Sequence, residues 1–345
     1  MNEREYTFLK SLSEAFGPSG EEDAVRDLIF QEIRPYADQI RIDSMGNLVA
    51  IKGKADFLLI CAHMDEVGFM ITQIREDGML RFSPIGGVDP KYLSSKRVRI
   101  GTNRIPGVIS AIPVHLNKEK NGKSSYSNLL IDIGARTKQE AESHISIGDC
   151  AVFDTKFSYL DPTHYTLKGK ALDNRIGCFL LCKLIADPEI QNGTFVFTVQ
   201  EETGLRGAAA FLGNNPFEYS IALDTTTAND LPSVKKHQMV CQLHFGAVIS
   251  LADGATIYRR SLVTSLFEYL TKMQIPHQTK SKRTGGNEAS AMQKAGLGSQ
   301  AISISVPCRY IHGPVGCVCV DDIEKSYFAL FYSYHFFKKK EGSKC

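Results

Sequence analysis

The chain has 345 residues, a length that predicts about two domains and a core large enough to need no disulfide bonds. Its 40 Lys and Arg residues nearly balance its 38 Asp and Glu residues, so the formal net charge is +2. This balance argues against a protein that binds nucleic acid through a strong basic field.

Nine cysteines are scattered along the chain without a CxxC pair, and an odd number of this kind is typical of reduced thiols in a cytoplasmic protein. The acidic, amphipathic N-terminal segment does not resemble a signal peptide. No apolar run approaches the ~20 residues that span a bilayer. We therefore expect a cytoplasmic protein that has no membrane partner.

The first predicted elements alternate between helix and strand. Apolar spacing predicts helices over 3–16 and 21–35, separated by the turn Gly17-Pro18-Ser19-Gly20. Strands are predicted at 47–53 and 57–65. The continuous apolar run of the second strand is typical of a strand that is buried on both faces.

The pattern changes over residues 69–163. Short β-like runs are separated by turn residues, and one helical stretch at 138–144 interrupts them. This pattern is typical of a small β domain or barrel. We expect a β-rich insertion domain in this part of the chain.

From about residue 164 the alternation of helix and strand returns. The predicted elements are helices at 174–186, 205–213 and 259–274, and strands at 194–200 and 219–226. This order favours a layered αβα domain with a mixed, mostly parallel sheet. The simplest organisation is one α/β domain, formed by residues 1–68 and 164–345, that a β-barrel-like insertion at 69–163 interrupts.

Several common catalytic motifs are absent from the sequence. There is no GxGxxG after a strand, no Walker A motif, no GxSxG and no HExxH. These absences argue against a dinucleotide-dependent dehydrogenase, a P-loop NTPase, an α/β-hydrolase and a thermolysin-type protease.

Acidic residues and histidines instead follow the predicted strands or lie in nearby loops. These candidate site residues are His63, Asp65, Asp173, Glu201, Glu202, Asp224 and His312. Ligands bind beyond the carboxyl ends of strands in open α/β sheets, so we expect several of these side chains at one sheet edge. Each alone has an ordinary explanation as a loop, turn or surface residue. The adjacent glutamates, however, would repel each other after a buried strand unless a cation lay nearby.

The number of candidate ligands points to two metal ions. Two imidazoles and three carboxylates exceed the four donors of one tetrahedral zinc, but they suit two ions if one carboxylate bridges. Such sites hydrolyse amides or phosphates. The count leaves Glu201 as a general base and Asp65 as the acid that orients His63, without deciding which acid bridges. Imidazole and carboxylate donors suit Zn²⁺, Co²⁺ or Mn²⁺.

Five segments together resemble the M42 family of dinuclear metallo-aminopeptidases, which includes tetrahedral and glutamyl aminopeptidases. They are CAHMDEVGFMI (61–71), LDNRIG (172–177), VQEETGLRGA (199–208), ALDTT (222–226) and RYIHGPVG (309–316). The resemblance extends over nearly the whole chain, including the insertion. Five motifs in the order of the family make it specific.

The resemblance implies a role for each candidate. Asp173 would be the bridging carboxylate, followed by a cis peptide bond to Asn174. The implied ligands of the first ion are His63, Asp173 and Asp224, and those of the second are Asp173, Glu202 and His312. Glu201 would be the general base and Asp65 the residue that orients His63.

The resemblance also implies an activity and an assembly. The expected reaction is the removal of N-terminal residues from short peptides. The insertion, roughly 69–163, would join two chains into a dimer, and dimers would close into a hollow tetrahedral dodecamer.

Two segments depart from the family pattern. Gly286-Asn287-Glu288-Ala289 stands where Gly-Thr-Asp-Ala is usual, in a segment that lies near the site in relatives, so the substrate preference can differ. Gly313-Pro314 follows His312 where Ser-Pro is common.

Two other functions are considered. A glycoside hydrolase of endoglucanase type would use two carboxylates and no metal, which leaves His63 and His312 without a role. A non-catalytic scaffold that keeps the fold is the second alternative, and the complete set of ligands argues against it.

Overall fold

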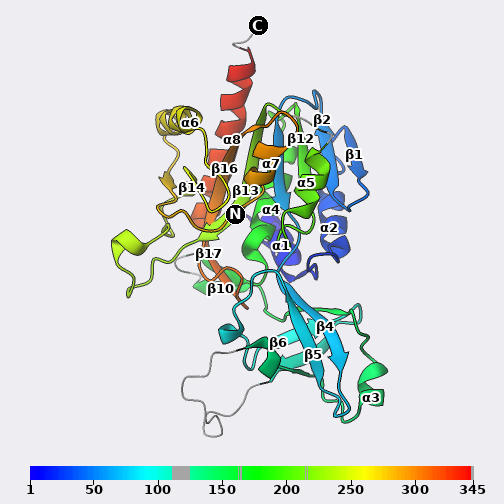
Figure 1. The fold of residues 1–345 in the computed structure, drawn as a ribbon. Coiled ribbons are helices and arrows are strands. Elements are labelled where there is room, and N and C mark those ends of the chain that lie inside the picture. The colour runs from blue at the N-terminus through cyan, green and yellow to red at the C-terminus, as the bar shows by residue number, and fades with distance from the viewer. Residues whose placement is uncertain (111–124, 162, 164, 214, 216, 343–345) are drawn as a thin grey trace.

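The computed structural model describes residues 1–110, 125–161, 163, 165–213, 215 and 217–342. It has a layered α/β body and a small β-barrel that projects from one end of this body (Figure 1). Residues 111–124 of the predicted insertion lie outside the described part.

The body is built on an eight-stranded mixed sheet. Its strands are β1 (Gln39–Ile42), β2 (Leu48–Lys52), β3 (Leu59–His63), β12 (Gly193–Thr198), β13 (Tyr219–Thr227), β14 (Ala247–Ile249), β15 (His277–Thr279) and β16 (Gln300–Cys308). They lie in the order β1-β2-β12-β3-β13-β16-β14-β15. At the centre, β3 pairs in parallel with β12 and β13, and every residue of β3 and β12 is buried. The predicted mixed α/β sheet is therefore confirmed.

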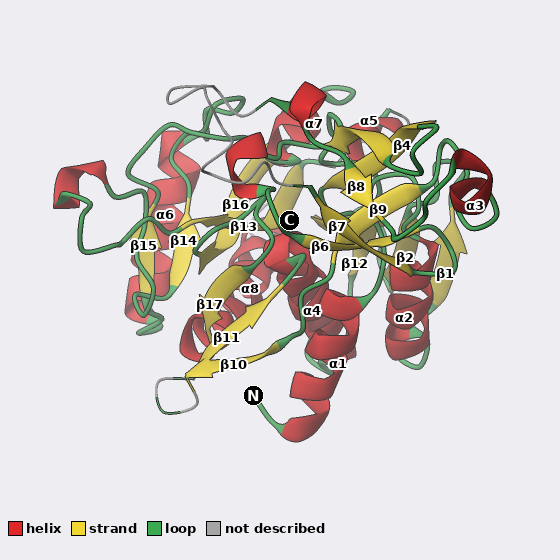
Figure 2. Cartoon of the chain, turned by 90° about the horizontal axis from the view of Figure 1, so that it is seen from below, coloured by secondary structure: helices red, strands yellow, loops and turns green. Residues whose placement is uncertain are grey.

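Helices cover both faces of this sheet (Figure 2). They are α1 (Glu3–Glu14), α2 (Asp23–Ile33), α4 (Leu172–Ala186), α5 (Arg206–Leu212), α6 (Arg260–Lys272), α7 (Ala289–Lys294) and α8 (Val320–Gly342). On one face α4 packs against β3 and β13, and α8 packs against β14 and β16. On the other face α7 packs against β13 and β16 and contacts α5. None of the described helices is both long and apolar enough to cross a bilayer.

The barrel closes in the order β4-β5-β8-β7-β6-β9 and has a hydrophobic core of its own, which includes Phe69, Phe82 and Phe153. Its strands are β4 (Gly68–Ile74), β5 (Leu80–Ile85), β6 (Arg97–Ile100), β7 (Ile105–Ile109), β8 (Ile131–Asp132) and β9 (Cys150–Phe153), and α3 (Lys138–Glu142) packs against β4. These short strands and the single helix α3 match the β-rich pattern predicted for this part of the chain, and β4 begins one residue before the predicted boundary at 69.

A third, three-stranded sheet adjoins the site. It has the order β10-β11-β17, formed by β10 (Ser158–Asp161), β11 (Thr166–Gly169) and β17 (Gly316–Cys319). Three short 3₁₀ helices complete the described elements: η1 (Pro90–Tyr92), η3 (Tyr126–Asn128) and η4 (Lys236–Gln238). Because β11 precedes α4 and β17 follows the His312 loop, this sheet brings two distant chain segments together.

Candidate metal centre

The carboxyl ends of three neighbouring strands place four of the predicted site residues. His63 is the last residue of β3, Asp224 lies near the end of β13, and Glu201 and Glu202 follow β12. The three strands run parallel and side by side, so their ends meet at one sheet edge.

Asp173 reaches the same edge from the first turn of α4. The peptide bond between Asp173 and Asn174 is cis, as the resemblance implied. The Asn174 side chain donates from Nδ2 to the Leu223 carbonyl of β13 at 2.8 Å, and its Oδ1 accepts from the Gly177 amide at 3.1 Å. These bonds fix the start of α4 beside Asp224.

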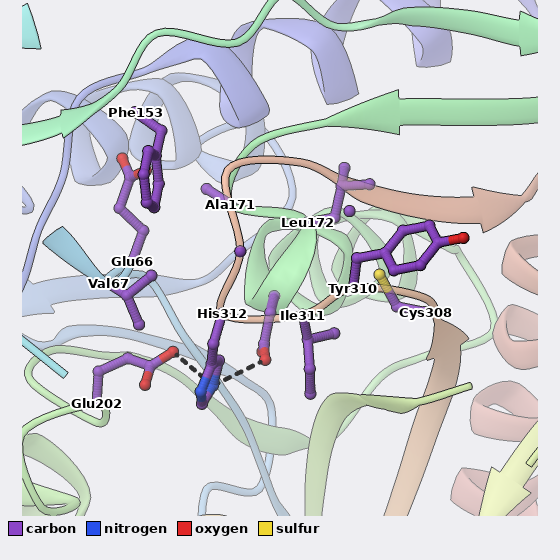
Figure 3. Close-up of a pocket in the computed structure, with 13 residues that line it drawn as sticks. Glu66, Val67, Phe153, Ala171, Leu172, Glu202, Cys308, Tyr310, Ile311 and His312 are labelled. Atoms are coloured by element: carbon purple, nitrogen blue, oxygen red, sulfur yellow. Dashed lines mark ion pairs between the residues drawn. The ribbon is translucent and has the colours of Figure 1, made fainter. Parts of the chain in front are cut away.

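Asp173 lies between the two histidines. His63 Nε2 is 3.5 Å from Asp173 Oδ1 and 3.7 Å from Asp224 Oδ1. His312 Nε2 is 3.4 Å from Asp173 Oδ2 and 3.3 Å from Glu202 Oε1, and Figure 3 marks both contacts of His312 with dashed lines. Each carboxylate oxygen of Asp173 therefore faces a different imidazole.

These separations fit two metal ions. Donor atoms at 2.0–2.1 Å from a tetrahedral zinc lie about 3.3–3.4 Å from one another. The measured N···O distances of 3.3–3.7 Å are close to that spacing. Two sets of donor atoms each lie within 4.8 Å of one another: one from His63, Asp173 and Asp224, and one from Asp173, Glu202 and His312. Glu201 lies within the same distance of His63 from the first set and Glu202 from the second.

Asp65 is fully buried and organises more of the site than His63 alone. Its Oδ1 lies 3.3 Å from His63 Nδ1 and accepts from the Glu201 amide at 3.0 Å. Its Oδ2 accepts from the Glu202 amide at 3.1 Å and from Ser19 Oγ at 2.6 Å. Asp65 thus holds the imidazole, both glutamates and the Gly17–Gly20 turn in one arrangement.

The electrostatics separate the acids into two kinds. Burial raises the pKa of Glu201 well above its usual range; His63 opposes this shift, but Asp224 and Glu202 add to it. For Asp173, burial also acts to raise the pKa, yet the hydrogen bonds from His312 and His63 hold it well below its usual range. Asp173 is therefore held as an anion, whereas the surroundings of Glu201 favour its protonated form in the metal-free site.

Comparison with known proteins identifies the family. The family model described as M42 glutamyl aminopeptidase matches residues 46–327, which is most of the chain. The chain belongs to the M42 peptidase family. The predicted family, fold class and aminopeptidase activity are therefore confirmed. M42 aminopeptidases are metal-dependent, and this member has groups that could hold metal ions.

Relatives match the M42 chain over almost its whole length. Lysyl aminopeptidase of Pyrococcus furiosus is 32% identical over 334 residues, covering 93% of this chain and 94% of the relative. The structure of aminopeptidase APDkam598 from Desulfurococcus kamchatkensis has a TM-score of 0.90 at 32% identity, covering 96% and 94% of the two chains. TET1 peptidase of Pyrococcus horikoshii has a TM-score of 0.84 at 32% identity, covering 96% and 99%.

The barrel of this M42 chain contributes a backbone contact to the site. His312 Nδ1 lies 3.2 Å from the carbonyl oxygen of Gly87, which follows β5. The adjacent Gly86 has φ +80°, and a Cβ there would lie 2.9 Å from Val67 and 3.2 Å from Glu202 Cβ. No sequence motif indicated this pair, because it acts through backbone and close approach and not through a side chain.

The departure at 286–289 lies beside the site. Asn287 lines the cavity above the acids and donates from Nδ2 to Ser303 Oγ at 2.8 Å. Glu288 is buried behind the ends of β3 and β12, where it accepts from Cys61 Sγ at 3.1 Å and from the Thr198 hydroxyl. Burial raises the pKa of Glu288 to about 7. Only the first of these two residues thus faces the substrate space.

Metal affinity should increase with pH. Burial alone would lower the pKa of His312, but Asp173 and Glu202 raise it to about 11 in the metal-free site. A metal ion must therefore displace a proton from this imidazolium, and raising the pH favours the deprotonated form that binds. We expect the dissociation constant of the ion at this site to fall about tenfold per pH unit between pH 6 and 8.

Calorimetric titration of the metal-free protein in two buffers of different ionisation enthalpy measures both the affinity and the protons released. His335 pairs with Glu189 and belongs to neither group of candidate metal donors, so it serves as the control. His335→Gln should leave the proton release unchanged. A dissociation constant independent of pH would contradict the expectation.

Three buried charged side chains, Glu66, Lys170 and Arg175, form an ion cluster close in sequence to the site residues. The Glu66 Oε1 atom accepts from Lys170 Nζ at 2.5 Å and from Arg175 Nη2 at 3.3 Å. Arg175 is fully buried and also donates to the Met64 carbonyl at 2.7 Å and to the Gly17 carbonyl at 3.2 Å. Burial lowers the pKa of Lys170 to about 8, although Glu66 opposes the shift. The cluster therefore connects the segment that follows His63 to the residues that flank Asp173.

Glu66→Gln should destabilise the fold by about 3–5 kcal/mol, because it leaves two buried cations without their anion. Urea unfolding of the metal-free protein measures this loss. Glu76→Gln, which removes an exposed partner of Lys138, should change stability by less than about 0.5 kcal/mol. Equal stability of the two variants would contradict the role of the cluster.

Proposed function

We propose that the chain removes N-terminal residues from short peptides with two divalent ions, Zn²⁺ or Co²⁺ in preference to Mn²⁺. The proposed ligands are His63, Asp173 and Asp224 for one ion, and Asp173, Glu202 and His312 for the other. The position of Asp173, with one oxygen toward each imidazole, carries this proposal. When bound, such ions polarise the scissile carbonyl and lower the pKa of the attacking water.

Glu201 is proposed as the general base. Its carboxylate accepts a proton from the attacking water as the water oxygen bonds to the carbonyl carbon. As the carbon–nitrogen bond breaks, Glu201 donates this proton to the leaving amine. The position of Glu201, whose carboxylate lies within 4.8 Å of donor atoms of His63 and Glu202, supports this role.

Asp65 is proposed to keep His63 Nε2 directed at the site by accepting from Nδ1. The free α-amino group of the peptide would bind the second ion or a nearby acid, which would explain a preference for N-terminal residues. The cavity that contains the site has a volume of ≈ 400 Å³, which is room for one side chain and a few backbone atoms.

Peptide assays test the proposal against the alternatives. Aminoacyl-p-nitroanilides should be hydrolysed, their N-acetylated counterparts should not, and a chelator should abolish the activity. A glycoside hydrolase would cleave cello-oligosaccharides in the presence of chelator, and a scaffold would cleave neither substrate. Either of these results would contradict the proposal.

We also propose that the catalytic body (1–68 and 164–345) assembles through the insertion (69–163) into dimers and then a dodecamer. The P. horikoshii relative can assemble into a tetrahedron or an octahedral shell. Large apolar side chains are exposed on the barrel, such as Val108 and Ile147.

The unpaired, buried thiols of the eight described cysteines support the cytoplasm as the compartment.

Light scattering should therefore find a particle far larger than one chain, and glutamate at Val108 and Ile147 should convert it to smaller species, since charge disfavours apolar burial. Glutamate at Ile42, an exposed apolar residue of the body, is the matched control. A wild-type monomer with full activity would contradict this assembly.

A further inference from the structure

The turn that carries Glu201 is held by side chains from other parts of the chain. It spans residues 199–205, between the end of β12 and the start of α5. Its first four backbone amides donate, in order, to side-chain oxygens of Asn47, Glu22 and, for the last two, Asp65. All three acceptor residues are buried. The contacts of Asp65 are described above, whereas those of Asn47 and Glu22 have no place yet in the proposed reaction.

Glu22 reaches this turn from the N-terminal part of the chain, where it directly precedes α2 and is 4% exposed. Its Oε1 atom accepts from the Gln200 amide at 3.0 Å and from the Gly20 amide at 2.9 Å. Burial and, to a smaller extent, the Asp65 carboxylate raise the pKa of Glu22. Because these surroundings disfavour a negative charge, the contribution of this side chain is a hydrogen-bond acceptor at a fixed position.

Gln200 needs an acceptor for its amide because its backbone conformation is unfavourable. Its φ is +55°, in the left-handed region that residues with a Cβ seldom occupy. The Gln200 carbonyl accepts from the Arg206 amide at 3.1 Å, and the Glu201 carbonyl accepts from the Leu205 amide at 2.9 Å. The carbonyls of the turn are therefore bound to the start of α5, and Glu22 supplies the partner on the amide side. Together these bonds fix the direction of the Glu201 side chain.

Helix capping does not explain the position of the Glu22 carboxylate. The side chain makes no capping hydrogen bond to α2, a helix that the structure describes in full. It instead bonds to an amide 178 residues later in the chain, directly before the proposed base. The contact is therefore specific to the turn at Gln200.

We propose that Glu22 is a positioning residue for the general base: it holds the Gln200 amide and thereby keeps the Glu201 carboxylate directed at the attacking water. This inference rests on the proposed function. Glu22 belongs to none of the groups of candidate metal donors, and Asp65 holds the Glu202 amide independently of it. Its removal should therefore affect the base more than the ions.

Substitutions at position 22 test this role in the metal-loaded enzyme. Glu22→Ala should lower kcat on an aminoacyl-p-nitroanilide by about 10–100-fold, because a small displacement of a catalytic group is this costly, with KM changed by less than about threefold. Glu22→Gln keeps an oxygen at the position of Oε1 and should restore kcat to within about threefold of wild type. Elemental analysis should find the same metal content in all of these proteins.

Two further variants control for folding and for local charge. Glu22→Asp withdraws the carboxylate from Gln200 by one methylene but is a favourable residue to precede α2, so it should lower kcat in a protein that remains folded. Glu21→Ala removes the adjacent acid, which is exposed, and should leave kcat unchanged.

A double-mutant cycle with Glu201→Gln separates positioning of the base from general support of the fold. When the base is already absent, adding Glu22→Ala or Glu22→Asp should cost less than about threefold more in kcat. An equal loss in both backgrounds would overturn this inference, as would a Glu22→Asp enzyme with wild-type kcat or a Glu22→Gln enzyme as slow as Glu22→Asp. A Glu201→Gln enzyme with wild-type kcat would overturn the proposed function instead.

Discussion

Glu201→Gln should lower kcat by about 10²–10⁴-fold while the protein keeps its metal. The amide has the shape of the carboxylate but cannot accept a proton from water. In wild type, the Glu201 carboxylate lies within 4.8 Å of donor atoms of His63 and Glu202, which is a suitable position for a base beside the proposed ions. Steady-state rates on an aminoacyl-p-nitroanilide, with elemental analysis of the same sample, measure both parts of the expectation.

Asp65→Asn provides a useful contrast, because this residue acts through its neighbours. We expect a smaller loss, about 10–100-fold in activity or metal affinity, from a misoriented His63. Glu76→Gln, on the surface of the barrel, should have no effect on kcat. A Glu201→Gln enzyme with nearly wild-type kcat would remove Glu201 from the role of base.

Asp173→Ala should impair both metal sites at once. Asp173 belongs both to the group with His63 and Asp224 and to the group with Glu202 and His312. Its removal therefore takes one donor from each group. We expect a loss of at least ~10³-fold in kcat/KM, because the metal ions supply several kcal/mol of transition-state stabilisation.

Metal stoichiometry separates a bridging residue from an ordinary ligand. Asp224→Ala and Glu202→Ala should each weaken one ion and leave the other, whereas Asp173→Ala should weaken both. Equilibrium dialysis followed by elemental analysis gives the number of ions per chain. Two tightly bound ions in Asp173→Ala would contradict the bridging assignment.

The sequence allowed the prediction of the layered body and the convergence of the site, because both depend on local patterns. The apolar runs before His63, Glu201 and Asp224 identify central strands, and parallel strand ends must share an edge. The short strands of the barrel were also predicted, since turn residues bound each of them.

Other features depend on tertiary contacts that leave no local pattern. Helix α8 was not predicted: its Phe- and Tyr-rich sequence has residues that favour strands, and the sheet imposes the helix by burying residues such as Tyr334 and Phe337. The three-residue ion cluster joins Glu66 to Lys170 and Arg175 over more than 100 residues of chain.

The contact between Gly87 and His312 means that the barrel is not an exchangeable module. A barrel from another M42 enzyme would have to reproduce the path of the Gly86–Gly87 backbone, or His312 would lose the oxygen that faces its Nδ1. Chimeras that graft a new assembly surface should therefore keep this turn from the recipient body. If subunits associate through the barrel as proposed, the same contact would connect that association to the proposed ligand His312, since a shift of the barrel that moves Gly87 would change the position of the oxygen beside the imidazole.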